Sequence, residues 1–376
     1  MSVKPAPKRM RIADIAKLAG VSPSAVSAAL NDRPQIAEST RRHILEVMRG
    51  ARYTPLASAR ALSGRRSRQI GFLFSNATPH GVINPYFGLM MSGALEVCAA
   101  RDHQLLVCGA DLYNDARFEL PACVRQNTID GLLVAGIIGP ATLRKLREAG
   151  PPFIVIDGRY DDDVLFLEVD VGQTLDRILR HMRRIGHRLV RVYYDFPRTL
   201  EIFEELRRNF AARSGMDDFR LEAAHVGGGD QYGFGESQAD RWLEQPAGER
   251  YTAFIANHQI AQGFLHRATP KGVRCPRDIS IVVSDDNPYV RNTVLPLAAI
   301  GGDNSALGRL ATNLLIDLVE NRKSFMEVKS ALTAAWQAPS FEMRDSLGPP
   351  PEFGQYLGRS RRRAALSVAA AAECRQ

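Results

Sequence analysis

Cysteine, tryptophan and long apolar runs are all scarce in this sequence. Five cysteines and two tryptophans occur among 376 residues. The cysteines are scattered and odd in number, without the paired spacing of a zinc site, so we expect reduced thiols rather than a disulfide framework. No stretch approaches the roughly 20 apolar residues of a membrane span, and no apolar run of a secretory signal follows the basic N-terminus. We therefore expect a cytoplasmic protein without a membrane partner.

Signatures of the common enzyme classes are missing as well. The chain has no Gly-x-Ser-x-Gly elbow, no Walker loop and no His-Glu-x-x-His motif. Its eight histidines are dispersed. The glycine-rich segment 227–235, GGGDQYGFG, lacks the strand-to-helix pattern of a dinucleotide site, so we expect a loop there. These absences predict no cofactor, no bound metal and no catalytic residues.

Residues 11–33, RIADIAKLAGVSPSAVSAALNDR, have the pattern of two short helices around a turn. Gly20 can adopt the left-handed conformation of the turn, and Ser22 followed by Pro23 favours a helix start. A third helix is expected over about 38–48. Apolar residues at helical spacing predict the buried sides, namely Ile12, Ile15, Ala16, Ala19, Val26, Leu30, Ile44, Leu45, Val47 and Met48. This pattern is typical of a helix-turn-helix, whose second helix enters the major groove of DNA, and it disfavours three ordinary helices at the start of an enzyme.

The positive charge of the chain is concentrated at its N-terminus. Residues 1–68 hold 14 Lys or Arg and 4 Asp or Glu, whereas the remaining residues hold 35 and 37. The net charge of +8 therefore comes from the first fifth of the chain. Because each Lys or Arg that neutralises a phosphate releases condensed counterions, such a segment provides affinity for the DNA backbone. Double-stranded DNA is the partner that both the charge and the helix-turn-helix pattern predict.

Residues 56–66 have the composition of a short hinge helix that ends at Gly64 and is flanked by arginines. An isolated helix of this length is marginal in water, so we expect the segment to be disordered when free and ordered on DNA. Leu62 would then be available to wedge between base pairs from the minor groove. The residues alone are equally compatible with a plain linker whose Leu62 packs on the body.

From Gln69 onward the pattern becomes α/β. Apolar runs typical of buried parallel strands alternate with helical segments, and they occur at 70–74, 105–108, 131–136, 153–156, 189–194, 252–256 and 279–284. The cycle restarts after Val169, which predicts two similar lobes with crossovers near 169, 300 and 330. A ligand cleft is expected between the lobes, at the carboxyl ends of the strands.

Several segments resemble the lactose-repressor (LacI/GalR) family of transcription regulators. They are IADIAKLAGVSPSAVSAALN, YTPLASARAL, INPYF, IGHRLV, FIANHQIAQG, DISIVVSDD and PLAAIGGDNSALG, in the family's order, and the resemblance covers about residues 10–345. It implies an all-α helix-turn-helix head and an α/β body of two doubly wound lobes like those of periplasmic binding proteins. It also implies a homodimer that binds a pseudo-palindromic operator, usually as a repressor, and responds to a small-molecule effector, often a sugar or nucleoside.

The resemblance places DNA-reading positions of the second helix at Pro23, Ser24 and Ala28. Two of these cannot form a hydrogen bond through a side chain, so direct readout should be thin. We expect Ser24 and Ser27 to contact base edges or phosphates, Ala28 to meet a thymine methyl, and the hinge to read minor-groove shape. Arg11 departs from the Thr or Ser usual in the family. The full set of predicted DNA-binding residues is Arg11, Ser22, Pro23, Ser24, Ser27, Ala28, Asn31, Tyr53, Arg60 and Leu62.

The effector site implied by the resemblance departs further from the family pattern. Glu204 stands where the family commonly has an arginine, and His258 replaces an Asp. If Asp157, Glu204 and Asp285 face the cavity, three carboxylates without an arginine favour an amine-bearing or cationic ligand, or a polyol. The predicted effector residues are Ser75, Tyr86, Asp157, Glu204, Asn257, Asp285 and Asn304.

The predicted organisation has five segments. They are a basic flexible arm (1–10), the helix-turn-helix domain (11–55), the hinge (56–66), the effector-binding and dimerisation domain (69–345) and a disordered or weakly helical tail (346–376). The tail lacks a leucine heptad, so a dimer is the expected assembly. Two alternatives remain open: a constitutive DNA binder with a degenerate effector site, and a ligand-handling protein or enzyme with a vestigial head. The intact apolar pattern of residues 11–48 disfavours the second.

Overall fold

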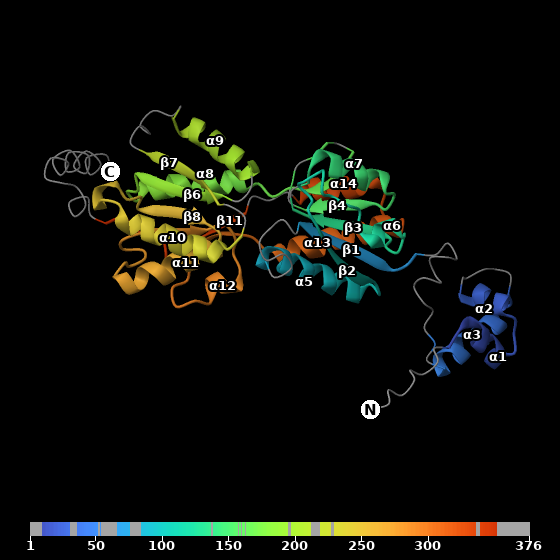
Figure 1. The fold of residues 1–376 in the computed structure, drawn as a ribbon. Coiled ribbons are helices and arrows are strands. Elements are labelled where there is room, and N and C mark those ends of the chain that lie inside the picture. The colour runs from blue at the N-terminus through green and yellow to red at the C-terminus, as the bar shows by residue number, and fades with distance from the viewer. Residues whose placement is uncertain are drawn as a thin grey trace.

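The computed structural model shows a small helical unit, here called the head, followed by two α/β lobes (Figure 1). It describes residues 10–30, 36–51, 53, 66–75, 84–136, 138–156, 158, 160–161, 163–194, 197–211, 219–226, 229–335 and 339–351. The predicted arm except residue 10, the predicted hinge except residue 66 and most of the tail lie outside these residues, as do Asn31 and Asp157. The helix-turn-helix head and the two-lobed parallel α/β body confirm the predicted fold class.

Three helices form the head: α1 (Ile12–Ala19), α2 (Pro23–Leu30) and α3 (Glu38–Gly50). Gly20 ends α1 with a φ of 65°, a left-handed conformation that glycine adopts without strain. Ile15, Val26 and Ile44, one from each helix, are fully buried together at the centre. The predicted apolar stripes therefore meet in one core.

The first lobe has a five-stranded parallel sheet in the order β2-β1-β3-β4-β5. Its strands are β1 (Gln69–Ser75), β2 (Gln104–Ala110), β3 (Gly131–Ala135), β4 (Phe153–Ile156) and β5 (Leu165–Leu167). One face packs against α5 (Pro85–Ala100), α13 (Asn304–Val319) and α14 (Phe325–Ala334). The other face packs against α6 (Ala122–Arg125) and α7 (Pro140–Glu148).

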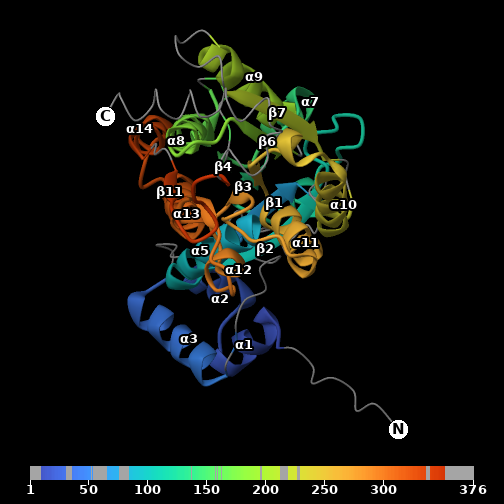
Figure 2. The ribbon, with the colours of Figure 1, turned by 90° about the vertical axis from the view of Figure 1, so that its left-hand side faces the viewer.

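The second lobe has a six-stranded sheet in the order β11-β10-β9-β8-β6-β7, parallel except for β11. Its strands are β6 (Leu189–Tyr194), β7 (Arg220–His225), β8 (Ala253–Ala256), β9 (Ser280–Val283), β10 (Ala298–Gly301) and β11 (Ser340–Glu342). The helices α8 (Val171–Arg184) and α9 (Pro197–Ala211) cover one face. The helices α10 (Gln231–Glu244), α11 (His258–Ala268) and α12 (Pro288–Arg291) cover the other. Figure 2 shows helices on both sides of the sheets.

Three crossovers join the lobes, and they determine which edges of the sheets face each other. The chain passes from β5 to α8, from β10 to α13, and from α14 to β11. In the first two, a strand of one lobe ends where a helix of the other lobe begins. Because helices in a parallel α/β lobe start at the carboxyl edge of the sheet, both carboxyl edges are directed towards the opposite lobe. Open α/β sheets bind their ligands at this edge.

Two details of the predicted organisation need correction. The third crossover follows Ala334 rather than lying near 330, because α14 continues packing on the first lobe through Leu332. The tail begins later than residue 346, since Ser346 is fully buried in the second lobe. Its hydroxyl donates to the carbonyl of Ile281 (2.6 Å) and accepts from the N–H of Ala298 (2.8 Å).

The glycine-rich segment 227–235 is also not wholly a loop, because α10 begins at Gln231. A Cβ atom at Gly235 would overlap the backbone of Ile260 in α11, and one at Gly263 would overlap the backbone of Tyr232 in α10. These glycines therefore serve close packing of two helices, which the local sequence did not reveal.

Candidate functional site

The amino end of α2 carries the hydroxyl groups that were predicted to contact DNA. Ser22, Pro23 and Ser24 are exposed, and Ser27 is half-buried. The oxygen of Ser22 accepts from the N–H of Ala25 (3.2 Å) and lies 2.7 Å from the hydroxyl oxygen of Ser24. Ser22 thus caps the helix while its hydroxyl stays at the surface. The helix N-terminus and these hydroxyls together present donors of the kind that bind phosphate oxygens.

Ala28 is a correction to the predicted DNA surface. Its side chain is only 9% exposed, and it lies on α2 between the core positions Val26 and Ala29. Ala28 is therefore not placed to contact a thymine methyl.

Two other predicted DNA-binding residues have different roles in the head. Arg11 is exposed and precedes α1, where its N–H donates to the carboxylate of Asp14 (2.8 Å). This bond is one half of a capping box, in which the third helical residue accepts from the N–H of the cap residue. Arg11 has no side-chain oxygen for the other half, which a Thr or Ser would provide. Tyr53 packs against the head core and its N–H donates to the carbonyl of Met48 (2.9 Å). Burial, reinforced by Asp14, raises the pKa of the Tyr53 hydroxyl. Arg60 and Leu62 lie outside the described residues.

The carboxyl edge of the second lobe holds a network of polar side chains. Asn257 caps α11 through its oxygen and donates to the side-chain oxygen of Gln231 (2.9 Å). Asp285 accepts from Asn287 and lies 3.3 Å from the ring nitrogen of His258. The His258 ring lies nearly parallel to that of Tyr289, with 6.3 Å between centroids.

Sequence reasoning identified Asn257 and Asp285 but missed Gln231 and Asn287 as members of this network. The signal that could have found them is their position directly beyond a buried strand or at a helix start. His258 and Asn287 are both buried, so the network is largely formed before any ligand arrives. It presents amides and a carboxylate that already has Asn287 and His258 as side-chain partners.

The first lobe supplies the predicted residues Ser75, Tyr86 and Asn304 from three different elements. Ser75 ends β1 and is buried, with the backbone of Gly136 at the end of β3 packed closely beside it. Tyr86 lies in the first turn of α5 and Asn304 is the buried first residue of α13. All three stand at the carboxyl edge, which agrees with a ligand position between the lobes. Asp157 lies outside the described residues.

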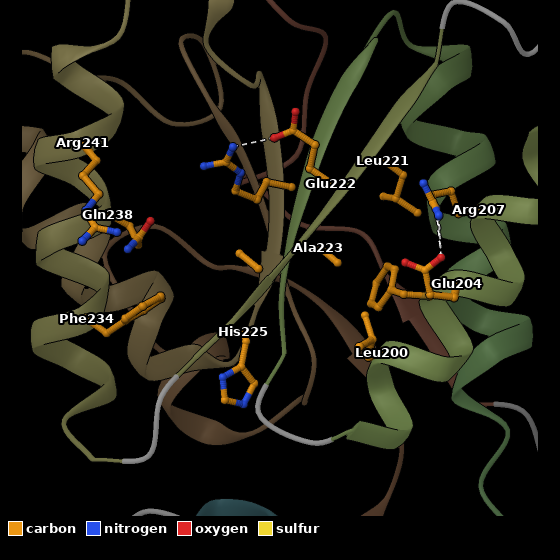
Figure 3. Close-up of a pocket in the computed structure, with 13 residues that line it drawn as sticks. Leu200, Glu204, Arg207, Leu221, Glu222, Ala223, His225, Phe234, Gln238 and Arg241 are labelled. Carbon is orange, nitrogen blue, oxygen red and sulfur yellow. Dashed lines mark hydrogen bonds and ion pairs between the residues drawn. The ribbon is translucent and has the colours of Figure 1, made fainter.

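Glu204 faces a different place from the one predicted. A pocket of about 590 Å³ follows the edge strand β7, with α9 on one side and α10 on the other (Figure 3). All of its lining residues belong to the second lobe, so it is not a cleft between lobes. Glu204 lies on the α9 side and forms an ion pair with Arg207 (2.7 Å). Across β7, Glu222 pairs with Arg191.

These ion pairs change the charge argument for the effector. The sequence suggested three carboxylates without a cation, yet Glu204 has Arg207 one helical turn away and Asp285 has His258 and Asn287. The turn of α9 that brings Arg207 to Glu204 is an (i, i+3) contact. Glu204 therefore does not join Asp285 in a cluster of carboxylates, and each of the two already has a side-chain partner.

Within the described part of the chain, no cluster of three or more His, Cys, Asp or Glu side chains is arranged to hold a metal ion. No helix in that part is both long and apolar enough to cross a membrane.

Two family models match separate parts of the chain. Residues 11–55 match the model described as bacterial regulatory proteins, lacI family. Residues 179–335 match the model described as periplasmic binding protein-like domain.

Similar proteins span most of the chain. The HTH-type transcriptional repressor PurR of Proteus mirabilis is 27% identical over 323 residues, which are 83% of this chain and 91% of that protein. The HTH-type transcriptional regulator DegA of Bacillus subtilis is 24% identical and covers 79% of this chain and 88% of its own length. A lac repressor dimer bound to operator and the anti-inducer ONPF has a TM-score of 0.69 at 20% identity, covering 90% of this chain and 99% of that one. A LacI-family regulator from Silicibacter pomeroyi has a TM-score of 0.72 at 18% identity, with 90% and 99% covered.

Proposed function

Because the chain belongs to the LacI/GalR family of transcription regulators, we propose that it is a sequence-specific DNA-binding repressor controlled by a small molecule. The observation that carries the proposal is an intact helix-turn-helix core, with an exposed hydroxyl-bearing helix start, within the basic segment of the chain. The two-lobed body, with both carboxyl edges directed towards the opposite lobe, supplies the control.

For DNA recognition we assign Ser22, Pro23, Ser24 and Ser27 to the major groove and Arg11 to a phosphate. The α2 surface has no long polar side chain among these residues, so base readout from it is weak. We also assign Asn31 and Tyr53 to DNA contact, and Arg60 and Leu62 to the minor groove, which they read through its shape and deformability. Most of the discrimination then comes from DNA deformation at the hinge.

For the effector we assign Ser75, Tyr86, Asp157, Asn257, Asp285 and Asn304. The second-lobe wall consists of amides and of the Asp285 carboxylate, which already has His258 and Asn287 as side-chain partners. Such a surface suits hydroxyl groups better than a free cation, because a cation would have to compete with the existing partners of Asp285. A neutral polyhydroxylated molecule, such as a sugar, is the ligand class this wall favours. The solved CelR regulator with cellobiose, at a TM-score of 0.57 and 17% identity, has the same fold.

The protein acts in the cytoplasm, on the nucleoid, as a homodimer, and has no catalytic role. The relatives are named as transcription regulators, and the lac repressor structure is a dimer on its operator. In this chain, exposed apolar side chains on α5 and on the edge strand β2 provide a surface for a second copy.

Selection from a randomised duplex pool tests the proposal. The purified protein should enrich a pseudo-palindrome, with an affinity that falls steeply as salt rises. Leu62→Ala should weaken binding to the selected duplex far more than binding to a scrambled one. Leu18→Ala is the matched control, because it removes an exposed leucine of α1. Failure to enrich any sequence at low ionic strength would remove the proposal.

A constitutive DNA binder is the second candidate, and the closed hydrogen bonding of Asp285 and Asn257 favours it. If Asn257 stays bonded to Gln231 and Asp285 to Asn287, these groups are not available to a ligand. Titrating a panel of neutral sugars and polyols against the selected complex separates the candidates. A molecule that changes the DNA affinity supports the regulated form, and a panel without effect favours the constitutive one.

A further inference from the structure

The chain that comes from the head enters the first lobe at Ser67 and Arg68, directly before β1. The carboxylate of Asp130, which directly precedes β3, accepts from both backbone N–H groups at 2.6 Å and from the Ser67 hydroxyl at 2.9 Å. Ser67 is only 3% exposed. Two successive N–H groups that converge on one anion form a strong backbone site. A single carboxylate thus holds the end of the linker.

Neighbouring strands hold the same junction from both sides. The carbonyl of Arg68 accepts from the N–H of Gln104 at the start of β2 (2.8 Å), and the N–H of Asp130 donates to the carbonyl of Gln69 (2.8 Å). Arg68 has a φ of 56°, a left-handed conformation disfavoured for a residue with a side chain. Such a conformation persists only where the surroundings impose it. The Arg68 guanidinium also pairs with Asp102.

The helix α13 connects this junction to the crossover between the lobes. It begins directly after β10 of the second lobe and ends against the start of β3, where a Cβ at Gly131 would lie 3.1 Å from Leu315. At the same end, Arg101 after α5 binds Asp317 (2.8 Å) and Glu320 (2.9 Å) of α13. The junction and the crossover therefore lie at opposite ends of one helix packed along its length.

We propose that Asp130 is a positioning residue that fixes the linker on the first lobe and thereby holds the two heads of a dimer at the separation that the operator requires. This inference rests on the proposed function. A dimer that engages two half-sites gains affinity through the effective concentration of its second head, which falls when the point of attachment is loose. We call Asp130 with its bonds to Ser67 and Arg68 the clamp. Because α13 ends beside the clamp, a movement of one lobe relative to the other reaches the linker through packed, hydrogen-bonded groups.

Asp130→Asn tests the clamp with little change in shape. The substitution replaces one acceptor oxygen by an NH₂ group, so one N–H of the linker loses its partner and meets another donor. We expect an affinity loss of about tenfold or more for the duplex selected by the wild type, because charged acceptors contribute most strongly. Affinity for a scrambled duplex should stay within about twofold, since non-specific contact does not require a fixed spacing. Fluorescence anisotropy at one fixed salt concentration measures both.

Asp102→Asn is the matched control. It makes the same chemical change at the same junction, but Asp102 contacts the Arg68 side chain rather than the linker backbone. We expect its affinity to stay within about twofold of wild type. Equal losses in Asp130→Asn and Asp102→Asn, or no loss in either, would overturn the proposal.

Hydrogen exchange without DNA separates a failed clamp from a failed function. In Asp130→Asn the amides of Ser67 and Arg68 should exchange about tenfold faster or more, while those within β4 keep their rates. If the wild type selects no duplex, the proposed function fails and the exchange rates alone decide on the clamp. If exchange accelerates throughout the lobe, Ser67→Ala provides the comparison. It keeps both backbone bonds to Asp130 and loses the two hydroxyl bonds, one to Asp130 and one from the N–H of Gln69. Wild-type affinity in Ser67→Ala together with wild-type exchange at Arg68 then counts against the clamp.

Discussion

His187, next to the left-handed Gly186, joins three separated segments of the second lobe. Its ring is fully buried, donates from Nε2 to the carbonyl of Gly348 (2.9 Å) and accepts at Nδ1 from the hydroxyl of Thr252 (2.8 Å). Burial lowers the pKa of His187 to about 4, although the Gly348 carbonyl opposes the shift. The neutral ring is therefore part of the folded structure at neutral pH.

The free energy of unfolding should fall as pH drops from about 6.5 to about 4, because the unfolded chain binds a proton that buried His187 does not. The stabilisation is fully present above the unfolded pKa and is lost as pH falls towards the folded one. A shift of this size corresponds to roughly 3 kcal/mol. Urea unfolding at pH 7.5, 6.5, 5.5 and 4.5 measures it. His187→Gln should flatten the pH dependence of the free energy of unfolding, whereas His43→Gln, at an exposed position of the head, should not. The same pH dependence in wild type and His187→Gln would show that His187 is not the group responsible.

Cys108 and Cys123 show a residue-scale contact that spacing alone did not indicate. Their sulfur atoms lie 3.5 Å apart, one on β2 and the other in α6. Burial raises the pKa of Cys108 to about 12, with the neighbouring thiol adding to the shift. Cys108 is therefore a protonated thiol at neutral pH, and Cys98, Cys108, Cys123 and Cys275 are all free of disulfide bonds.

At the scale of elements, pairs of helices approach each other through glycine. A Cβ at Gly93 of α5 would overlap the backbone of Ser305, and one at Gly308 of α13 would overlap the backbone of Met90. The two helices pack backbone to backbone along the face of the first sheet. This close packing makes α13 a rigid connection between the crossover and the linker.

Gly308→Ala should destabilise the protein by about 3 kcal/mol, because backbone atoms cannot move aside as a flexible side chain can. Differential scanning calorimetry would show a lower midpoint for the transition of the body. Gly172→Ala in α8 is the control: the nearest atoms to its new Cβ are side-chain atoms at 3.3 and 3.5 Å. Its stability should change by less than about 1 kcal/mol. Similar midpoints for both variants would show that α5 and α13 can separate without cost.

At the scale of the whole molecule, the exposed apolar side chains are not evenly spread. Leu95 on α5 is 56% exposed and Val107 on the edge strand β2 is 44% exposed, on elements that contact each other. An edge strand with apolar residues is prone to pair with another chain. A second copy that covers this surface would give a dimer with two heads, one for each half of a pseudo-palindrome.

Val107→Lys should shift the protein from dimer to monomer in sedimentation velocity, because the subunit contact would bury an unpaired charge. The affinity for the selected duplex should fall with it, since a monomer has only one head. Met326→Lys, which alters a 67% exposed apolar residue of α14, should remain dimeric. A dimer that persists in Val107→Lys would place the subunit contact elsewhere.

The elements of the fold followed from local patterns. Continuous apolar runs indicated β1, β3, β4, β6, β8 and β9 because strands covered on both faces need apolar side chains throughout. The strands that local reasoning missed are short, as β5, β10 and β11 are, or lie at an edge with charged residues, as β7 does. Those strands are defined by their neighbours in the sheet rather than by their own composition.

By itself the sequence determined the head, the concentration of basic charge and the two-lobed body, because periodicity and charge are properties of neighbouring residues. Only the tertiary structure decided that Ala28 is covered, that Glu204 pairs with Arg207 beside β7, and that Asp130 reaches Ser67 across 63 positions of the chain. Such contacts depend on the order of strands and on how closely helices approach, and no local pattern carries that information.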